Sequence, residues 1–326
     1  MKPKFSIAIP AYNRSDYLTE AVKSCLMQTA HDFEVIISDD CSMEDLGTVA
    51  KSFRDSRIRY SRSGERLGRA KNHQRAASLA EGDYVVNLNS DDLLLPEFLE
   101  IAGKALESRH EAAAVYSSMT FLAGSTISGF QAVPKIRFAD RHVYLQNLWL
   151  EKNHGIAPTC CLFRRNSFHQ IGGYRTFLKF AFDWDLYMRF MTLGGGVIFL
   201  PEVLAMYRKH EDQGSKTALR EGLYDVLDLW KLDEYSHWPS WEIADVVIAE
   251  LRNTGRTASG WIKICSQIRR RGLTRRLTIG AGKAICKRLW RRMQCRGVWR
   301  DGNYESPLNL DRAMRAANLL LGSLNR

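Results

Sequence analysis

Two adjacent carboxylates, Asp91 and Asp92, follow the apolar run 84–88, where the turn after a strand would expose them. Paired carboxylates beside a polar loop suit a hard divalent cation, which keeps some of its waters and also binds phosphate oxygens. The structural alternative is a turn in which one of the two caps the following helix. The pair therefore predicts either a cation site or a capping turn.

A second pair, Asp39 and Asp40, follows the β-branched run 33–38. A carboxylate at such a position can accept a hydrogen bond from an N–H group on the edge of a nucleobase. Tyr12, after the apolar run 5–10, has the flat ring needed to pack on a base, although it could equally fill the edge of the core. Together these side chains indicate a nucleotide pocket.

Basic residues gather around Gly68, before or within the start of a predicted helix. Cations and unpaired amides at a helix N-terminus suit a diphosphate. The alternative is a solvated basic helix face. The candidates are Arg66, Arg69 and Lys71.

A third acidic pair, Asp183 and Asp185, flanks Trp184 at the start of a predicted helix. One of them can cap that helix. The functional alternative is a general base beside an aromatic acceptor pocket. His210 is a possible ligand of a metal or a phosphate, but its spacing alone does not identify it.

The elements that must position these residues alternate along the chain. Apolar runs predict strands, and apolar residues at helical spacing predict helices between them. Strands are expected at 5–10, 33–38, 58–61, 84–88, 112–119 and 160–163, and helices at 15–26 with Ser15 as N-cap, at 67–80, after Pro96 and at 183–193. Residues 116–135 are expected to make an antiparallel excursion with turns near Gly124 and Gly129.

This order of elements predicts an α/β fold, in which helices cover both faces of a mostly parallel sheet. Ligands of such sheets bind outside the carboxyl ends of the strands. Polar groups follow three of the predicted strands, at 12–13, 39–40 and 91–92. We therefore expect these groups to meet at one edge of the sheet.

An ordered series of motifs resembles the family-2 inverting glycosyltransferases of the GT-A fold, especially bacterial enzymes that assemble surface polysaccharides. The resemblance runs from about residue 6 to residue 215. The motifs are Ile9-Pro10-Ala11-Tyr12-Asn13-Arg14, Ser38-Asp39-Asp40-Cys41-Ser42, Arg69-Ala70-Lys71-Asn72, Glu81-Gly82-Asp83-Tyr84, Asn89-Ser90-Asp91-Asp92, Gly172-Gly173-Tyr174, Asp183-Trp184-Asp185-Leu186 and Tyr207-Arg208-Lys209-His210.

The resemblance implies a role for each matching position. Asp40 would read the N3–H group of the base, and Asp183 would be the base that activates the acceptor. Further nucleotide contacts would come from Pro10, Tyr12, Asn13, Arg69, Lys71 and Asp91, ligands of Mg²⁺ or Mn²⁺ from Asp91, Asp92 and His210, and the acceptor pocket from Trp184 and Asp185.

The chain departs from the family pattern at three positions. Asn89 stands where Asp is common, Phe182 where Glu often precedes the base, and Lys71 where many relatives have Arg. The metal site is therefore expected to rest on Asp91 and Asp92, and the phosphate contact stays open among the three basic residues around Gly68.

The activity that the resemblance implies is metal-dependent transfer of a sugar, of the hexosyltransferase type. The donor would be a UDP- or dTDP-sugar, and the acceptor hydroxyl would belong to a sugar or a lipid-linked oligosaccharide. A single displacement would invert the anomeric configuration.

Charge divides the chain unevenly. Residues 251–300 hold 15 Lys and Arg and no Asp or Glu, whereas the whole chain carries a net charge of +11, so the remainder is slightly acidic. We expect a catalytic domain over 1–215 and a basic helical region over 216–326. Apolar residues at helical spacing within that region predict either contact with an anionic membrane or packing on the catalytic domain. They are Ile285, Cys286, Leu289, Trp290 and Met293.

Composition favours a cytoplasmic protein, or one peripheral to the inner face of the plasma membrane. The seven cysteines contain no C-x-x-C pair, and the apolar stretch at the N-terminus is too short for a signal peptide. A nucleic-acid-binding protein that uses the basic region is the alternative from another class, but no nucleic-acid motif is present and no nucleic acid is expected. A G-x-G-x-x-G loop is also missing after the first strand, which argues against a dinucleotide oxidoreductase. A non-catalytic relative that binds sugar nucleotides is the remaining alternative.

Overall fold

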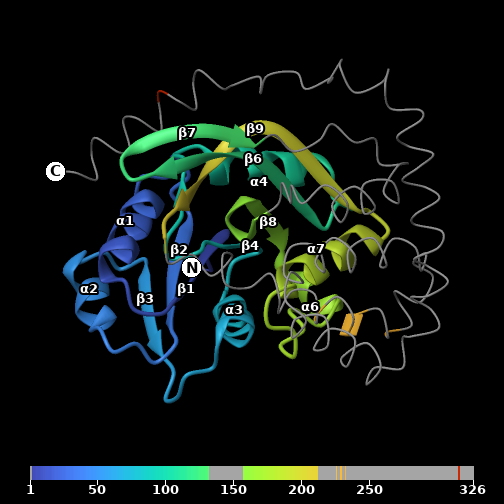
Figure 1. Ribbon diagram of the computed structural model, residues 1–326. Coiled ribbons are helices and arrows are strands. Elements are labelled where there is room, and N and C mark those ends of the chain that lie inside the picture. The colour runs from blue at the N-terminus through green and yellow to red at the C-terminus, as the bar shows by residue number, and fades with distance from the viewer. Residues whose placement is uncertain are drawn as a thin grey trace, which may run out of the picture.

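The computed structural model describes residues 2–131 and 157–211, together with residues 225, 228, 229, 232 and 315. Helices pack on both sides of a curled sheet (Figure 1). The predicted basic helical region 216–326, its apolar positions at 285–293 and its predicted membrane contact lie outside the described residues, apart from those single positions. Among the residues described, no helix is long and apolar enough to cross a membrane.

The described strands form one sheet of nine. They are β1 (Phe5–Ala11), β2 (Phe33–Asp39), β3 (Ile58–Arg62), β4 (Tyr84–Asn87), β5 (Leu93–Leu94), β6 (Ala114–Ala123), β7 (Thr126–Gln131), β8 (Cys161–Arg164) and β9 (Val197–Lys209). Their spatial order is β3-β2-β1-β4-β8-β6-β9-β5, and β7 pairs with β6.

The described helices are α1 (Ser15–Leu26), α2 (Leu46–Ser52), α3 (Arg69–Ser78), α4 (Phe98–Ser108), α6 (Arg165–Gln170) and α7 (Phe182–Thr192), and a short 3-10 helix, η2, spans Pro158–Cys160. The predicted helices are confirmed to within about two residues at most ends. Helix α3 begins later than expected because Gly68 has φ +84°, a backbone conformation that glycine adopts readily and that ends the preceding loop.

Parallel pairing in the first half of the chain confirms the predicted sheet. Strand β1 lies between β2 and β4, parallel to both, and β3 continues the parallel set beyond β2. The sequence did not predict the second half in full. Strand β8 runs antiparallel between β4 and β6, and the long strand β9, which no pattern indicated, pairs in parallel with β6.

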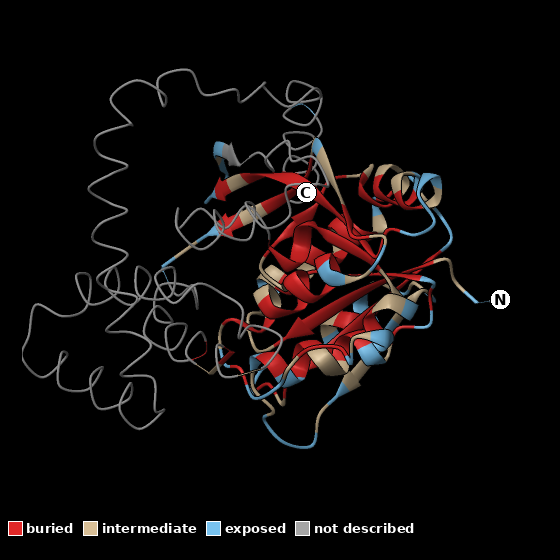
Figure 2. Ribbon diagram, turned by 90° about the vertical axis from the view of Figure 1, so that its right-hand side faces the viewer, coloured by how far each residue is buried: buried red, intermediate tan, exposed pale blue. Residues whose placement is uncertain are grey.

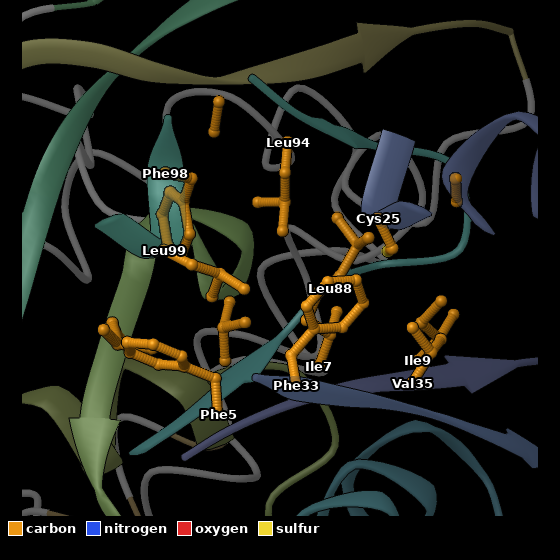
Figure 3. Packing of buried hydrophobic residues seen from close by; sticks show 14 of the residues in the cluster. Phe5, Ile7, Ile9, Cys25, Phe33, Val35, Leu88, Leu94, Phe98 and Leu99 are labelled. Carbon is orange, nitrogen blue, oxygen red and sulfur yellow. The ribbon is translucent and has the colours of Figure 1, made fainter. Parts of the chain in front are cut away.

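Alternate residues of the central strands face opposite layers. Ile7 and Ile9 of β1 pack with α1, α2 and α4, whereas Ala8 packs with α3, α6 and α7. Figure 3 shows the first of these layers, with Ile7, Val35, Phe98 and other apolar side chains gathered between sheet and helices. The central strands are buried over their length in Figure 2. A two-layer core of this kind holds the strand ends in fixed positions.

Two local expectations need correction. Ser15 is not the N-cap of α1: Arg14 is, in a left-handed conformation, and Glu44 accepts hydrogen bonds from the backbone N–H groups of Arg14 and Ser15, each at 2.8 Å. The β6–β7 hairpin is present and turns at Gly124, but Gly129 lies inside β7. Neither difference moves a strand end.

Candidate active site

Strands β1 and β2 end in two loops that hold each other. Asn13 donates its backbone N–H to the Ser42 hydroxyl, and its side-chain oxygen accepts the N–H of Met43, both at 2.8 Å. Pro10 is buried on β1 opposite Ser38. The predicted nucleotide residues Pro10 and Asn13 therefore lie at the carboxyl edge of the sheet, near the end of β1 and in the loop that follows it.

The two carboxylates after β2 have different surroundings. Asp39 is fully buried, and its oxygens accept hydrogen bonds from Ser42, Tyr60 and Arg62. Burial and the Asp39 charge raise the pKa of Tyr60 to about 12, so the phenol stays protonated as a donor. Asp39 is thus a structural carboxylate that joins β2 to β3.

Asp40, predicted to read the base, holds the loop before α3. Its two oxygens accept backbone N–H groups of Leu67 at 2.6 Å and Gly68 at 3.0 Å. The positive φ of Gly68 helps present this N–H to the carboxylate. Asp40 therefore couples the end of β2 to the basic loop in front of α3.

The predicted base-stacking ring, Tyr12, has a cation on its face. The Arg66 guanidinium carbon lies 4.0 Å from the centre of the Tyr12 ring. Arg69 and Lys71 are both exposed on α3, and Arg69 approaches the Phe180 ring at 5.8 Å. Arg66 and Arg69 thus have different neighbours, Arg66 the Tyr12 ring and Arg69 the loop before α7.

The turn after β4 holds Asp91 and Asp92 in unequal positions. Asp92 is almost fully buried, and its carboxylate accepts hydrogen bonds from Asn89, Thr159 and the backbone N–H of Arg208, at 2.6 to 2.9 Å. Burial, with the neighbouring charge of Asp91, raises the pKa of Asp92 well above its ordinary value. Asp92 therefore ties β4, η2 and β9 together, and Asp91 presents the more accessible carboxylate.

Strand β9 brings distant side chains to this turn. The backbone oxygen of Asp91 accepts the Arg208 Nε–H at 2.8 Å, and the Arg208 guanidinium also pairs with Glu20 of α1. His210 Nε2 lies 3.0 Å from Asp91 Oδ2 and 3.0 Å from an Arg14 guanidinium nitrogen. The structure thus joins two of the three predicted metal ligands, Asp91 and His210, across 119 residues of chain.

The described residues contain no cluster of three or more His, Cys, Asp and Glu side chains placed to hold a metal. Asp91 and His210 offer one carboxylate and one imidazole, with 26% and 10% of the side chain exposed. This donor set fits Mn²⁺, and the carboxylate alone fits Mg²⁺, when phosphate oxygens and water complete the coordination. The residues present are therefore compatible with a divalent cation that arrives with a diphosphate.

Asp183, the predicted base, lies in the first turn of α7 and is half-buried. Its Oδ1 accepts the N–H of Trp184 at 2.8 Å. Burial raises the pKa of Asp183 to about 6, although the Trp184 hydrogen bond and the Arg69 charge act in the opposite direction. A carboxyl with this pKa is ionised near neutral pH and can still accept a proton, which a general base requires.

Trp184 and Asp185 have different roles in the structure. Trp184 is partly exposed beside Asp183, as an acceptor pocket requires. Asp185 is fully buried, and its carboxylate pairs with Arg175 at 2.7 Å and Arg189 at 2.5 Å. These ion pairs leave Asp185 no surface toward an acceptor, so it supports α7 from inside.

Sequence patterns did not indicate His73, which links the two halves of the site. Its Nδ1 lies 2.9 Å from the backbone oxygen of Arg69, its Nε2 lies 3.3 Å from Asn89 Oδ1, and its ring packs 4.9 Å from Phe182. Burial lowers the pKa of His73 to about 4, so the ring is neutral at physiological pH. No signal in the sequence indicates this role, because the contact with Asn89 joins residues 16 positions apart.

Thr159 and Asp225 are further site residues that sequence patterns did not indicate. Thr159 donates its hydroxyl to Asp92 at 2.6 Å. Asp225 accepts three backbone hydrogen bonds from the loop before α7.

A depression of about 520 Å³ also opens near Lys4, Tyr84, Glu107 and Arg164, but it lies at the amino end of β4, away from the candidate site residues.

The fold and these contacts define a class: an α/β protein in which polar side chains gather at the carboxyl edge of the parallel strands β1, β2 and β4, the edge where ligands of such sheets bind. The sequence profile of glycosyl transferase family 2 matches residues 6–172, about half of the chain. The chain belongs to glycosyl transferase family 2.

Individual relatives agree with this assignment. An uncharacterized glycosyltransferase of Rickettsia typhi is 29% identical over 230 residues, 70% of each chain. Glycosyltransferase GlyG of Streptococcus pneumoniae is 25% identical over 231 residues, 67% of this chain and 74% of GlyG. The crystal structure of residues 1–349 of S. aureus TarS with UDP-GlcNAc matches with a TM-score of 0.61 at 20% identity, over 80% of this chain and 79% of that chain. This likeness confirms the predicted GT-A fold.

Proposed function

We propose that this glycosyltransferase catalyses inverting, metal-dependent transfer of a sugar from a UDP- or dTDP-sugar to an acceptor hydroxyl. The observation that carries the proposal is the position of Asp183 at the start of α7. It is a half-buried carboxyl with a pKa of about 6, and the Arg69 cation acts on it. That carboxyl is poised to take a proton near neutral pH.

The donor nucleotide occupies the carboxyl edge of β1, β2 and β4 in this proposal. Tyr12 supplies a ring face for the base, and Asp40, which is buried and accepts the N–H groups of Leu67 and Gly68, holds the loop before α3 next to the base. Crystal structures of TarS with UDP and with UDP-GlcNAc support a uridine donor, since TarS shares this fold. Arg69 and Lys71 are the cations available to the diphosphate, because Arg66 lies over the Tyr12 ring.

Asp91 and His210 hold the divalent cation in this proposal, and Asp92 keeps their turn in place. A bound Mg²⁺ or Mn²⁺ supplies charge that stabilises the departing nucleoside diphosphate. Mannosyltransferase PcManGT from Pyrobaculum calidifontis, of similar fold, has a solved structure in complex with GDP-Man and Mn²⁺, which is consistent with this assignment.

In the transfer step Asp183 accepts the proton of the acceptor hydroxyl as the hydroxyl oxygen attacks the anomeric carbon. The bond from that carbon to the diphosphate oxygen breaks, and the configuration inverts. Trp184 lies next to the base and lines the acceptor pocket. The acceptor proposed here is a sugar or a lipid-linked oligosaccharide of a surface polysaccharide, and the basic region 251–300 supports an acceptor at an anionic membrane surface.

The test is release of nucleoside diphosphate from a panel of sugar nucleotides that contains UDP-GlcNAc, a dTDP-hexose and GDP-Man, with Mn²⁺, with Mg²⁺ and with EDTA. We expect release from one donor only, dependent on the cation and lost in Asp91→Asn. Asp16→Asn removes the same charge and is the control, because Asp16 is an exposed carboxyl in the first turn of α1 and not one of the candidate site residues.

Calorimetric titration with each nucleotide separates catalysis from binding. Donor binding without turnover in the presence of a range of acceptors would favour the non-catalytic sugar-nucleotide-binding alternative. Turnover that continues unchanged in EDTA would contradict the metal dependence.

A further inference from the structure

The helix that carries the proposed base begins without a cap of its own. The N-cap of α7 is Ala181, whose side chain has no hydrogen-bond acceptor. The backbone N–H groups that precede a helix need a partner when they are buried. Here the partner comes from 44 residues further along the chain.

Asp225 supplies it. One oxygen, Oδ2, accepts the N–H groups of Lys179 at 2.9 Å, Phe180 at 2.6 Å and Ala181 at 2.8 Å. Asp225 is 5% exposed, so this carboxylate is withdrawn from water and satisfied by the backbone it holds. A negative group at a helix N-terminus also interacts favourably with the helix dipole.

Neighbouring residues dock the same segment on the catalytic body. Leu229 is fully buried in the core cluster that contains Phe182 and Leu186 of α7, and Leu232 packs against that cluster. The spacing of Asp225, Leu229 and Leu232 is that of one helix face. These contacts cross the predicted domain boundary at residue 215 and place Asp225, Leu229 and Leu232 with the catalytic domain.

We propose that Asp225 is a positioning residue for the transfer reaction: it fixes the loop 179–181 and thereby the start of α7 and the carboxyl of Asp183. The inference rests on the proposed function, in which Asp183 is the base. Phe180 and Ala181, both bonded to Asp225, directly precede the helix turn that bears Asp183, so a shift of this loop moves the base relative to the acceptor. A displacement of about 1 Å at a reacting group can cost about 100-fold in rate.

The charge of Asp225 also acts on the pKa of Asp183, which hydrogen bonding to the loop would not do by itself. Its negative charge acts to raise the pKa of Asp183, whereas the Arg69 cation of α3 lowers it. Among the described residues, the phenols of Tyr174 and Tyr187 also interact with Asp183, and burial raises their pKa values well above the ordinary range, so both stay neutral. Loss of the Asp225 charge therefore moves the ionisation of Asp183 to lower pH.

The experiment compares the full-length wild type with Asp225→Asn and the control Asp228→Asn. Asp228 carries the same charge three residues further along, but the loop 179–181 is held by Asp225. For Asp225→Asn we expect kcat for sugar-nucleotide turnover to fall about 10- to 100-fold, KM for the donor to stay within about twofold, and the acid limb of the kcat–pH profile to move to lower pH. Asp228→Asn should keep the wild-type kcat and the wild-type position of the acid limb in the kcat–pH profile.

A purely structural role would lower kcat and thermal stability but leave the acid limb in place, and that result would overturn the proposal. Wild-type kcat in Asp225→Asn would overturn it too. Hydrogen–deuterium exchange of the wild type provides a reading that does not depend on the variant folding. The amides of 179–181 should exchange slowly, and rapid exchange there would refute the hydrogen bonds from these amides to Asp225.

The same measurements separate this inference from the proposed function. If Asp183→Asn keeps full activity, Asp183 is not the base and the proposed mechanism fails. Slow exchange at 179–181 in the wild type would still support the hydrogen bonds from these amides to Asp225. If Asp183→Asn is inactive and the acid limb does not move in Asp225→Asn, the mechanism stands and the positioning role fails.

Discussion

The ionisation of Asp183 should set the lower pH limit of the reaction. A general base acts in its deprotonated form, so the rate rises with pH through the pKa of that group. Burial raises the pKa of Asp183 to about 6 from the ordinary value of 3.8. The acid limb of kcat is therefore expected near pH 6 and not near pH 4, where an exposed aspartate would place it.

The size of the effect follows from the fraction ionised. With a pKa of about 6, roughly nine-tenths or more of Asp183 is deprotonated at pH 7, but only about one-tenth at pH 5, so kcat should fall about tenfold over these two units. An aspartate with its ordinary pKa would lose less than about one-tenth of the rate over the same interval. The two cases are readily distinguished.

The assay is initial-rate release of nucleoside diphosphate from pH 5 to pH 8.5 at saturating donor and Mn²⁺. Asp183→Asn should lower kcat by about 10²- to 10⁴-fold and abolish the limb. Arg69→Gln should move the limb to higher pH, because the cation that favours the ionised form is removed. A rate independent of pH between 5 and 8, or an Asp183→Asn enzyme within about tenfold of the wild type, would refute the reasoning.

Three further perturbations test other parts of the site. Arg66→Ala uncovers the Tyr12 ring, so UDP affinity should rise about two- to fivefold by calorimetry; a fall would mean that Arg66 contacts the nucleotide. His210→Ala should raise the Mn²⁺ concentration for half-maximal rate about tenfold or more, and an unchanged Mn²⁺ dependence would exclude His210 as a ligand. Asp185→Ala leaves the buried Arg189 guanidinium and the partly buried Arg175 guanidinium without their carboxylate and should cost about 3–5 kcal/mol in urea unfolding. The exposed pair lost in Lys104→Ala should cost about 0.5 kcal/mol or less. A loss as small as that of this control would contradict the buried ion-pair assignment.

Two truncated chains, one ending near residue 218 and one after residue 240, differ in what they report about the basic region 251–300. A chain ending near residue 218 lacks Asp225 and Leu229, which contact the catalytic body, so its loss of activity would not report on membranes. A chain ending after residue 240 keeps both contacts and lacks the basic region. Co-sedimentation of the longer truncation with anionic vesicles therefore tests the proposed membrane contact cleanly.

The sequence by itself determined the first half of the fold. Runs such as 5–10 and 33–38 are buried on both faces and must be strands, and the apolar spacing of 15–26 allows one amphipathic helix between them. These features are local, and hydrophobic periodicity reports them directly. The polar groups at the strand ends followed from the topology.

Only the tertiary structure decided how those groups are used. Asp39 joins β2 to β3 whereas Asp40 holds the loop before α3, and Asp92 is buried whereas Asp91 is more accessible. No local pattern in the sequence distinguishes the two members of either pair. The distinction depends on partners distant in sequence, namely Arg62 for Asp39 and His210 for Asp91. Asp225 is the clearest case, because its role exists only where the chain returns to the start of α7. Burial and long-range hydrogen bonding assign these roles, and both are properties of the folded chain.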